Sequence, residues 1–236
     1  MTLFSSDDIQ VWHFDLDVPS EESDRLRQFL SGPEREREDR FHFERDRRRF
    51  AAAHGYLREI LGAYLDRDPQ AIRFDIAGSG KPRLASDQHS FLMFNLSHSH
   101  GRGVAAVWQG GDVGIDLELV RGDVNVQQLA DRFFAPAERS DLQACAASEG
   151  PTRFFRYWVA KEAFLKYKGL GLQLPLGDCL VTLDADGARA TIAWRRDRDD
   201  AESGLVRFLP LSEGWVGAVS AQGTDWTVRL GEWPVP

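Results

Sequence analysis

The sequence predicts an α+β fold and hints that this fold is a duplicated unit. Three observations support the prediction: each half of the chain contains a long helical segment, then a break with glycine, and then a series of strands. The residue-by-residue similarity between the halves is too weak to prove a duplication. No short-period repeat or low-complexity segment is visible in the sequence.

The first half is predicted to begin with a strand at 9–16, where apolar and polar residues alternate. A charged helix is expected at 20–30, with Gly32-Pro33 breaking it. Apolar residues at helical spacing predict a long helix at 49–65. The next expected elements are turns at 78–82 and 109–112 and strands at 71–76, 90–96, 104–108 and 113–120.

The second half is predicted to open with helices. Pro136 suits a first helical turn, and Gly169 is expected to end the last helix of the series. A charged hairpin loop is expected at 197–203. The helices are predicted at 126–134, 136–147 and 152–168, and the strands at 180–183, 191–194, 206–211, 215–220 and 226–230.

Composition narrows the class of protein. Hydrophobic residues make up 42% of the 236 residues, enough for a buried core, which argues against a disordered chain. The formal net charge of -8 argues against non-specific nucleic-acid binding, because that binding depends on Lys and Arg neutralising phosphates.

The cysteines and the N-terminal residues bear on the compartment. Cys145 and Cys179 form no Cys-x-x-Cys pair, so we expect two free thiols in a reducing cytosol. A disulfide between the two cysteines is the alternative. The first residues lack the features of a signal peptide, and no stretch approaches a membrane span. A soluble, cytoplasmic protein without membrane association is therefore expected.

The strand at 113–120 carries two carboxylates on one face. Side chains alternate along a strand, so Asp116 and Glu118 share a face with Gly114, while the opposite face is apolar. Burying two carboxylates is costly unless they are paired or bind a metal. Gly114 is expected to leave space for a ligand close to the backbone. A solvated acidic edge strand is an equally good interpretation of this strand alone.

The helix at 152–168 supplies complementary groups. Trp158, Glu162 and Lys166 share one helical face. A surface ion pair between Glu162 and Lys166, contributing only about 0.3–0.5 kcal/mol, is the simpler interpretation. Together with Asp116 and Glu118, however, these residues predict a site for Mg²⁺ and a substrate diphosphate, since Mg²⁺ usually takes one or two carboxylates plus phosphates.

Polar residues elsewhere could join this site. The run at 34–49 contains seven arginines, which most often form a solvated, ion-paired surface, but some could bind phosphate. Asn95, Ser97 and His98 follow an apolar run and could be turn or cap residues. Their functional interpretation depends on their occurrence together with the acidic residues.

Four segments in series resemble the surfactin-type 4'-phosphopantetheinyl transferases, the larger monomeric branch of that superfamily. Each motif alone is weak, but their order and spacing agree over about 29–183, and the series is specific. The segments are Gly80-Lys81-Pro82, Phe94-Asn95-Leu96-Ser97-His98-Ser99, Gly114-Ile115-Asp116-Leu117-Glu118, and Trp158-Val159-Ala160-Lys161-Glu162-Ala163-Phe164-Leu165-Lys166 with Gly169-Leu170-Gly171-Leu172 after it.

The resemblance implies two pseudo-twofold-related α+β halves, 1–110 and 111–236, with the active site in the cleft between them. It implies Asp116, Glu118 and Glu162 as Mg²⁺ ligands, although oxygen ligands do not distinguish Mg²⁺ from Mn²⁺. Coenzyme A would be the co-substrate, with His98 at its 3'-phosphate. The residues expected to bind it are Arg37, Arg48, Lys81, Pro82, Asn95, Ser97, His98, Asp116, Glu162 and Lys166.

Two residues depart from the family pattern. Glu34 lies where some relatives have a basic residue, and Phe50 lies where a hydroxyl residue can help hold the 3'-phosphate. The contacts to that phosphate are therefore the least defined part of the predicted site.

The implied reaction is transfer of 4'-phosphopantetheine from coenzyme A to a serine of an apo acyl, peptidyl or aryl carrier protein, releasing 3',5'-ADP. Glu162 is the expected general base, and Lys166 offsets developing charge. Carrier docking is expected on a local apolar patch of Val126, Leu129, Phe133 and Phe134, which could equally be the core face of a helix. A monomer is expected, because one chain contains both halves.

Two other functions fit parts of the pattern. A metal-dependent nuclease or phosphohydrolase also combines Asp, Glu and Lys, but Lys166 lies on a helix and not on the acidic strand. A non-catalytic carrier-protein binder is the second, and the intact Asp116, Glu118, Glu162 and Lys166 argue against it. The sequence does not distinguish carriers of fatty-acid, polyketide or nonribosomal-peptide synthesis.

Overall fold

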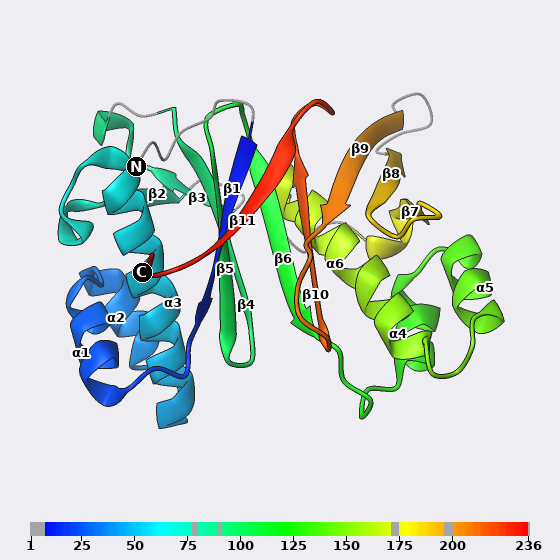
Figure 1. Cartoon of the computed structure of the whole chain (residues 1–236), viewed down its shortest axis with the longest axis horizontal. Coiled ribbons are helices and arrows are strands. Elements are labelled where there is room, and N and C mark those ends of the chain that lie inside the picture. Colours follow the sequence, from blue (N-terminus) through cyan, green and yellow to red (C-terminus); the bar gives the residue numbers. More distant parts are fainter. Residues whose placement is uncertain (1–7, 77–79, 89–90, 171–174, 196–200, 236) are drawn as a thin grey trace.

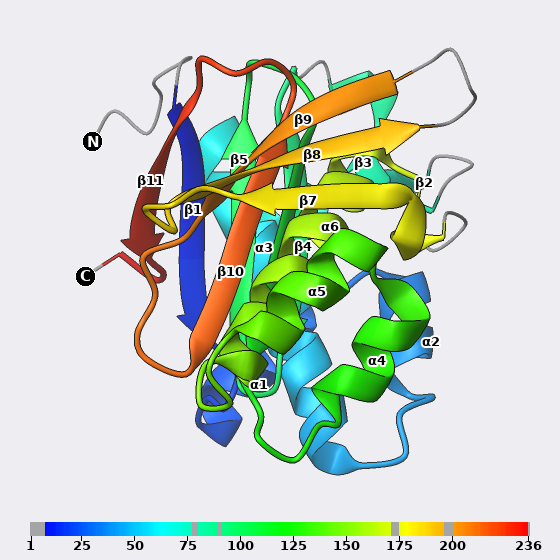
Figure 2. The ribbon, with the colours of Figure 1, turned by 90° about the vertical axis from the view of Figure 1, so that its right-hand side faces the viewer.

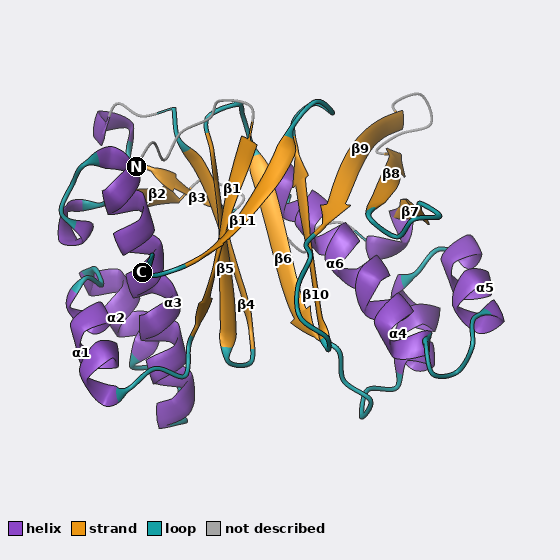
Figure 3. Cartoon of the chain, in the orientation of Figure 1, coloured by secondary structure: helices purple, strands orange, loops and turns teal. Residues whose placement is uncertain are grey.

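Two sheets lie against each other at the centre of the molecule, and helices cover their outer faces (Figures 1 and 3). The structure is a computed structural model that describes residues 8–76, 80–88, 91–170, 175–195 and 201–235. Its four layers, helix, sheet, sheet and helix, confirm the predicted α+β class with two halves.

The first half begins with a strand and three helices. Gly32-Pro33 does not simply break a helix: it begins one, with Ser31 and Glu34 forming a capping box. The elements are β1 (Asp8–Asp15), α1 (Ser20–Gln28), α2 (Gly32–Glu38), α3 (Glu44–Leu65), β2 (Phe74–Ile76), β3 (Pro82–Leu84), β4 (Met93–Ser99) and β5 (Arg102–Trp108), with short 3₁₀ turns at Pro69–Ala71 and Ser86–Gln88.

The second half follows the predicted order of helices and strands. Its elements are β6 (Val113–Leu119), α4 (Val126–Phe133), α5 (Pro136–Ala144), α6 (Gly150–Lys168), a 3₁₀ turn at Leu176–Asp178, β7 (Cys179–Leu183), β8 (Arg189–Arg195), β9 (Ala201–Phe208), β10 (Trp215–Ala221) and β11 (Thr227–Glu232). No described helix has both the length and the apolar character needed to cross a membrane.

Some predicted boundaries were wrong, for local reasons. Helix α3 begins at Glu44 rather than at residue 49, because the charged residues there are good helix formers. The strand predicted at 71–76 is shorter, because Ala71 ends a 3₁₀ turn and only Phe74–Ile76 form β2. Residues 201–203 of the predicted loop belong to β9, which begins at Ala201; residues 196–200 lie outside the described part of the chain.

The last strand joins the two halves. The first sheet has the order β11-β1-β5-β4, in which β11 pairs in parallel with β1. The second sheet has the order β6-β10-β9-β8-β7, and Figure 2 shows it from the outer side with α4, α5 and α6. One strand from the C-terminal end therefore completes the N-terminal sheet. The division at residue 110 stays a prediction.

The core between the sheets holds the halves together. The predicted apolar face of β6 is confirmed, because Val113, Ile115 and Leu117 pack there with residues such as Val104 and Val219. Fully burying one such side chain stabilises the fold by about 1.5–3 kcal/mol.

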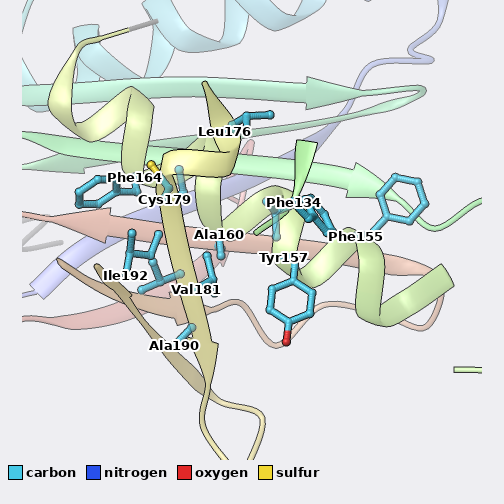
Figure 4. Close-up of a cluster of buried hydrophobic side chains, with 14 of the residues drawn as sticks. Phe134, Phe155, Tyr157, Ala160, Phe164, Leu176, Cys179, Val181, Ala190 and Ile192 are labelled. Atoms are coloured by element: carbon cyan, nitrogen blue, oxygen red, sulfur yellow. The ribbon is translucent and has the colours of Figure 1, made fainter. Parts of the chain in front are cut away.

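Each outer helix has a core of its own. Helix α3 packs on the outer face of the first sheet through Tyr56, Leu57 and Ile60. Helix α6 packs on the second sheet, where Phe164 belongs to the same core cluster as Ile192 of β8 (Figure 4). With its apolar residues facing the sheet, α6 is fixed in position beside β6.

Candidate active site

Asp116 lies where the two halves meet. Its side chain is only 6% exposed, and its Oδ1 accepts hydrogen bonds from Ser97 Oγ at 2.8 Å and Lys166 Nζ at 2.5 Å. Ser97 belongs to β4 of the first half, and Lys166 to α6 of the second. Lys166 Nζ also donates to Ser97 Oγ at 2.9 Å. Three predicted residues thus form one contact network across the two halves.

Glu118 lies two residues further along β6, on the same face. Its Oε2 accepts a hydrogen bond from Ser99 Oγ at 2.7 Å. Burial raises its pKa above the usual range, the Ser99 hydrogen bond lowers it in part, and the Asp116 charge raises it further. The prediction ended the strand before Ser97; β4 in fact continues to Ser99, which brings both serine hydroxyls to the carboxylates.

Helix α6 crosses β6 at Gly114. A Cβ atom at this position would lie 2.1 Å from the carbonyl oxygen of Ala163 and 2.2 Å from the backbone nitrogen of Tyr167. The expectation that Gly114 leaves space for a ligand was therefore wrong, because the helix backbone fills that space. This close approach instead places Glu162 and Lys166 beside the carboxylates of β6.

Glu162 is the third carboxylate of this group. Burial raises its pKa, the negative charges of Asp116 and Glu118 raise it further, and Lys166 counteracts them. Glu162 Oε1 and Asp116 Oδ2 are buried and have no hydrogen-bond partner within the described part of the chain. Such orphaned oxygens are rare in native proteins and point to a ligand, an ion or a water.

The donor atoms suit a hard cation, but their arrangement is not that of a completed metal site. Carboxylate oxygens are the ligands that Mg²⁺ prefers. Among residues placed by the structure, however, no group of three His, Cys, Asp or Glu side chains is arranged to hold a metal. Lys166 contacts Asp116, and Glu118 is bound by Ser99. The two orphaned oxygens, Asp116 Oδ2 and Glu162 Oε1, are carboxylate oxygens, and their chemistry therefore fits a hard cation.

Asn95 and Lys81 make backbone contacts. Asn95 Oδ1 accepts from the Ile115 N–H at 2.9 Å, which ties β4 to β6. Lys81 Nζ donates to the carbonyl oxygens of Val113 at 2.9 Å and Tyr167 at 3.3 Å. Asn95 and Lys81 therefore help to hold β4, β6 and α6 together. This structural role was not part of the prediction, which gave both residues only contacts to coenzyme A.

A cavity of about 800 Å³ opens beside this network. It is lined by α2, α3, β2, β3 and Leu96 of β4, and both Arg37 and Pro82 are part of its wall. Arg48 lies elsewhere, where it pairs with Glu44 at 3.1 Å. The structure thus brings Arg37 and Pro82 to the cavity but not Arg48.

His98 lies on β4 between Ser97 and Ser99, the two serines that contact the carboxylates, and two residues after Leu96 of the cavity wall. Its surface reaches solvent, yet the surrounding atoms desolvate it, as expected in an open recess. This desolvation lowers its pKa to about 4, and the charges of His54, Lys166 and Arg37 lower it further. His98 is therefore neutral at pH 7 and lies within electrostatic range of both regions.

The residues that depart from the family pattern lie in the cavity wall. Glu34 pairs with buried Arg58 at 2.7 Å and with His54 Nδ1 at 3.1 Å, and Phe50 stacks on His54 with ring centroids 4.1 Å apart. Sequence reasoning did not single out His54. Its place one helical turn after Phe50, on the same face of α3, was the available signal.

Of the four predicted docking residues, one is buried in the core and three are partly exposed. Phe134 is 5% exposed and stacks on Phe154, while Val126, Leu129 and Phe133 are partly buried against the same core. A second cavity, of about 760 Å³ between α5, α6 and β7, contains none of the predicted site residues.

Comparison with known proteins agrees with this geometry. Residues 18–108 match the family model described as "4'-phosphopantetheinyl transferase, N-terminal", and residues 112–219 match that of the "4'-phosphopantetheinyl transferase superfamily". The chain is 42% identical to 4'-phosphopantetheinyl transferase HetI of Nostoc sp. over 95% of its own length and 92% of the relative. It is 34% identical to 4'-phosphopantetheinyl transferase Sfp of Bacillus subtilis, over 74% of its length and 76% of the relative. With the matched halves meeting at Asp116, Ser97 and Lys166, the chain belongs to the 4'-phosphopantetheinyl transferase superfamily.

Proposed function

We propose that this protein transfers the 4'-phosphopantetheine group of coenzyme A to a serine of an apo carrier protein and releases 3',5'-ADP. The observation that supports it most is the Ser97–Asp116–Lys166 network, which joins both halves beside a cavity large enough for a nucleotide. Both relatives described above are named as transferases of this group, which favours transfer over hydrolysis of a phosphate ester.

Asp116 and Glu162 are proposed to hold Mg²⁺, or Mn²⁺, with Glu118 as a third ligand. Their orphaned buried oxygens support this assignment. When bound, the cation supplies neutralisation of negative charge on the diphosphate. Lys166, part of the same network, is proposed to leave Asp116 and donate to a phosphate oxygen, because an ammonium group is a general phosphate ligand.

The carrier serine oxygen forms a bond to the phosphorus on the pantetheine side of the diphosphate. The bond from that phosphorus to the bridging oxygen breaks, and 3',5'-ADP leaves with its electron pair. Glu162 accepts the serine proton, directly or through a water, because it lies at the proposed cation site on a rigid helix. Its position on α6, which packs tightly on β6, keeps the carboxylate in place.

Carrier and nucleotide are proposed to approach from different sides of the acidic group. Arg37, Pro82 and His98 are proposed to bind the nucleotide of coenzyme A, since they line or adjoin the cavity. Val126, Leu129 and Phe133 are proposed to contact the carrier, whereas Phe134 is too buried to do so. A monomer is proposed because the network lies within one chain, and a reducing compartment because Cys145 and Cys179 are free thiols.

Mass spectrometry of a carrier protein tests the function. The protein is incubated with coenzyme A, Mg²⁺ and a panel of apo acyl, peptidyl and aryl carriers. We expect a gain of one phosphopantetheine arm on the carrier serine and equimolar 3',5'-ADP. Cleavage of coenzyme A without modification of the carrier would support a phosphohydrolase. Binding of carrier with no change in mass would support a non-catalytic binder.

A further inference from the structure

A serine near the end of β4, which the proposed reaction does not use, holds one oxygen of a carboxylate in the acidic group. This residue is Ser99, whose hydroxyl donates to Glu118 Oε2 at 2.7 Å. We propose that Ser99 positions Glu118 so that a single oxygen of this carboxylate binds the cation, and that this arrangement selects Mg²⁺ against Ca²⁺. The inference rests on the proposed function, because that function needs the cation.

Three partners fix the direction of the Ser99 hydroxyl. A carboxylate that binds a cation is ionised and can only accept hydrogen bonds, so the single hydrogen of Ser99 Oγ goes to Glu118. The oxygen can then accept from two groups: His100 Nδ1 lies 3.1 Å away, and the Leu119 N–H donates to it at 3.5 Å. A hydroxyl has one hydrogen to donate and two lone pairs to accept with, so all of its capacity is used. Ser99 is also buried.

The residue after Ser99 adopts a backbone conformation that is uncommon for its type. His100 has a φ of 52°, in the left-handed region that glycine adopts without strain. It belongs to the two-residue connection between β4 and β5, a place where glycine is frequent. A glycine there would lack the contact between Nδ1 and Ser99 Oγ. Strain of this kind persists where the surrounding structure supports it, and it is frequent beside functional sites.

The neighbouring serine engages Asp116 in the same way. Ser97 lies two residues earlier, on the same face of β4, and donates to Asp116 Oδ1 at 2.8 Å. Asp116 Oδ2 is buried and has no partner within the described structure. At Glu118, Ser99 occupies Oε2, and no described residue bonds to Oε1. The two serines therefore leave one oxygen of each β6 carboxylate for a cation.

One oxygen from each carboxylate favours a small cation. Mg²⁺ requires near-octahedral geometry and usually takes one or two carboxylates, with water and phosphate in the other positions. Ca²⁺ takes about six to eight oxygens, and carboxylates often bind it through both oxygens. With Oε2 engaged by Ser99, Glu118 cannot add a second oxygen unless that hydrogen bond breaks. This cost applies to Ca²⁺ and not to Mg²⁺.

Displacement of bound Mn²⁺, followed by electron paramagnetic resonance on the full chain, tests the inference. Mn²⁺ is the probe, and Mg²⁺ or Ca²⁺ is added to compete with it. For the unmodified protein, we expect displacement at a lower concentration of Mg²⁺ than of Ca²⁺. Ser99→Ala should weaken Mg²⁺ by about 10–100-fold, the usual effect of removing a partner of a metal ligand, and should change Ca²⁺ by less than about threefold.

Two further variants and a control sharpen the test. Ser99→Thr keeps the hydroxyl and should retain the preference for Mg²⁺. His100→Gly removes the Nδ1 contact but suits the left-handed φ, so it should fold and should reduce the preference by less than Ser99→Ala does. The matched control is Ser220→Ala on β10, because Ser220 is also buried but donates to the Leu205 carbonyl oxygen at 2.9 Å. It should release Mn²⁺ as the unmodified protein does.

Equal weakening of both ions by Ser99→Ala, or no weakening, overturns the inference, as does an unmodified protein that binds no Mn²⁺ or does not prefer Mg²⁺. If Ser99→Ala does not fold, His100→Gly decides: a reduced preference for Mg²⁺ supports the inference, and an unchanged preference overturns it. Carrier modification by the unmodified protein is measured in parallel with Mg²⁺. No transfer refutes the proposed function, whereas normal transfer with an unchanged ion preference in Ser99→Ala refutes this inference alone.

Discussion

Two lysines on α6 lie close together in sequence but have opposite surroundings. Lys161 is fully buried, donates to the carbonyl oxygens of Leu176 and Cys179, and pairs with Glu138 at 2.8 Å. Glu138 in turn accepts from the backbone N–H groups of Ala135 and Val181. Lys166 pairs with Asp116, next to two carboxylate oxygens that have no partner in the described structure.

The difference separates a structural ion pair from a functional one. Around Lys161, both oxygens of the carboxylate are bonded, so the pair joins α5, α6 and β7 and leaves nothing for a ligand. Around Lys166, three carboxylates gather near one ammonium, and burial together with the excess negative charge raises the pKa of Glu162 and Glu118. An incomplete network of this kind costs stability and is expected where a cation or substrate completes it.

The largest expected effect is a loss of catalysis on replacing Glu162, one of the three carboxylates near Lys166. Glu162→Gln should lower the rate of carrier modification by about 10²–10⁴-fold, the usual contribution of a general base. The measurement is single-turnover transfer followed by mass spectrometry, with circular dichroism to confirm folding. Turnover at the normal rate would exclude Glu162 as the base.

The same variant has a pH signature. The folded-state pKa of Glu162 is raised, so its carboxyl group favours folding below the unfolded-state pKa, and this contribution is lost as pH rises through the folded value. The stability of Glu162→Gln should therefore improve relative to the unmodified protein as pH rises above about 4.5. Urea unfolding at several pH values measures this. A relative stability that falls with pH would contradict the raised pKa.

At the Lys161–Glu138 pair, in which both carboxylate oxygens have partners, a substitution should lower stability. Lys161→Met leaves Glu138 buried and uncompensated and should cost about 3–5 kcal/mol of unfolding free energy. The double variant with Glu138→Leu should recover much of this loss, since it removes the isolated charge. Urea denaturation of both variants makes the comparison. Equal losses in the single and double variants would mean that packing and not the charge pair matters here.

A third variant tests how α6 is held beside the carboxylates. Gly114→Ala puts a methyl group 2.1 Å from the Ala163 carbonyl oxygen, and backbone atoms cannot move aside cheaply. We expect a loss of about 3 kcal/mol in unfolding free energy, at the upper end for overpacking. Transfer should fall with it, because Glu162 and Lys166 move away from Asp116. Gly122→Ala, where nothing lies within 4 Å, is the control. Full activity in Gly114→Ala would show that the contact is not needed.

The smallest expected effect is at Glu34, whose pKa shift has the opposite sign to that of Glu162. Glu34→Gln should cost about 2 kcal/mol at pH 7, since hydrogen bonds to charged groups contribute about 1.5–3 kcal/mol. Its folded-state pKa is lowered to about 2, so this stability is present above the ordinary glutamate pKa of 4.5 and is lost as pH falls toward about 2. Unfolding at pH 7, 4 and 2 follows the loss. A stability difference between Glu34→Gln and the unmodified protein that does not change with pH would contradict the lowered pKa of Glu34.

Most of the secondary structure could be predicted from local patterns. The alternation in β6 and the helical spacing in α6 identified the faces that carry Asp116, Glu162 and Lys166. The errors fell where local patterns are ambiguous. Gly32-Pro33 could end one helix or begin the next, and only the Ser31–Glu34 contact showed that it begins α2. Gly114 could admit a ligand or a helix, and the packing of α6 decided for the helix.

The sequence by itself determined the family, the α+β class and the residues that form the acidic group, because these depend on motifs and on the periodicity of short segments. The tertiary structure alone decided which groups are neighbours: Ser97 and Ser99 against the carboxylates, Lys81 on two backbone carbonyls, and His54 on Glu34. The physical reason is that such contacts join segments distant in sequence, and their energy depends on burial and on unpaired charge, which no local pattern records.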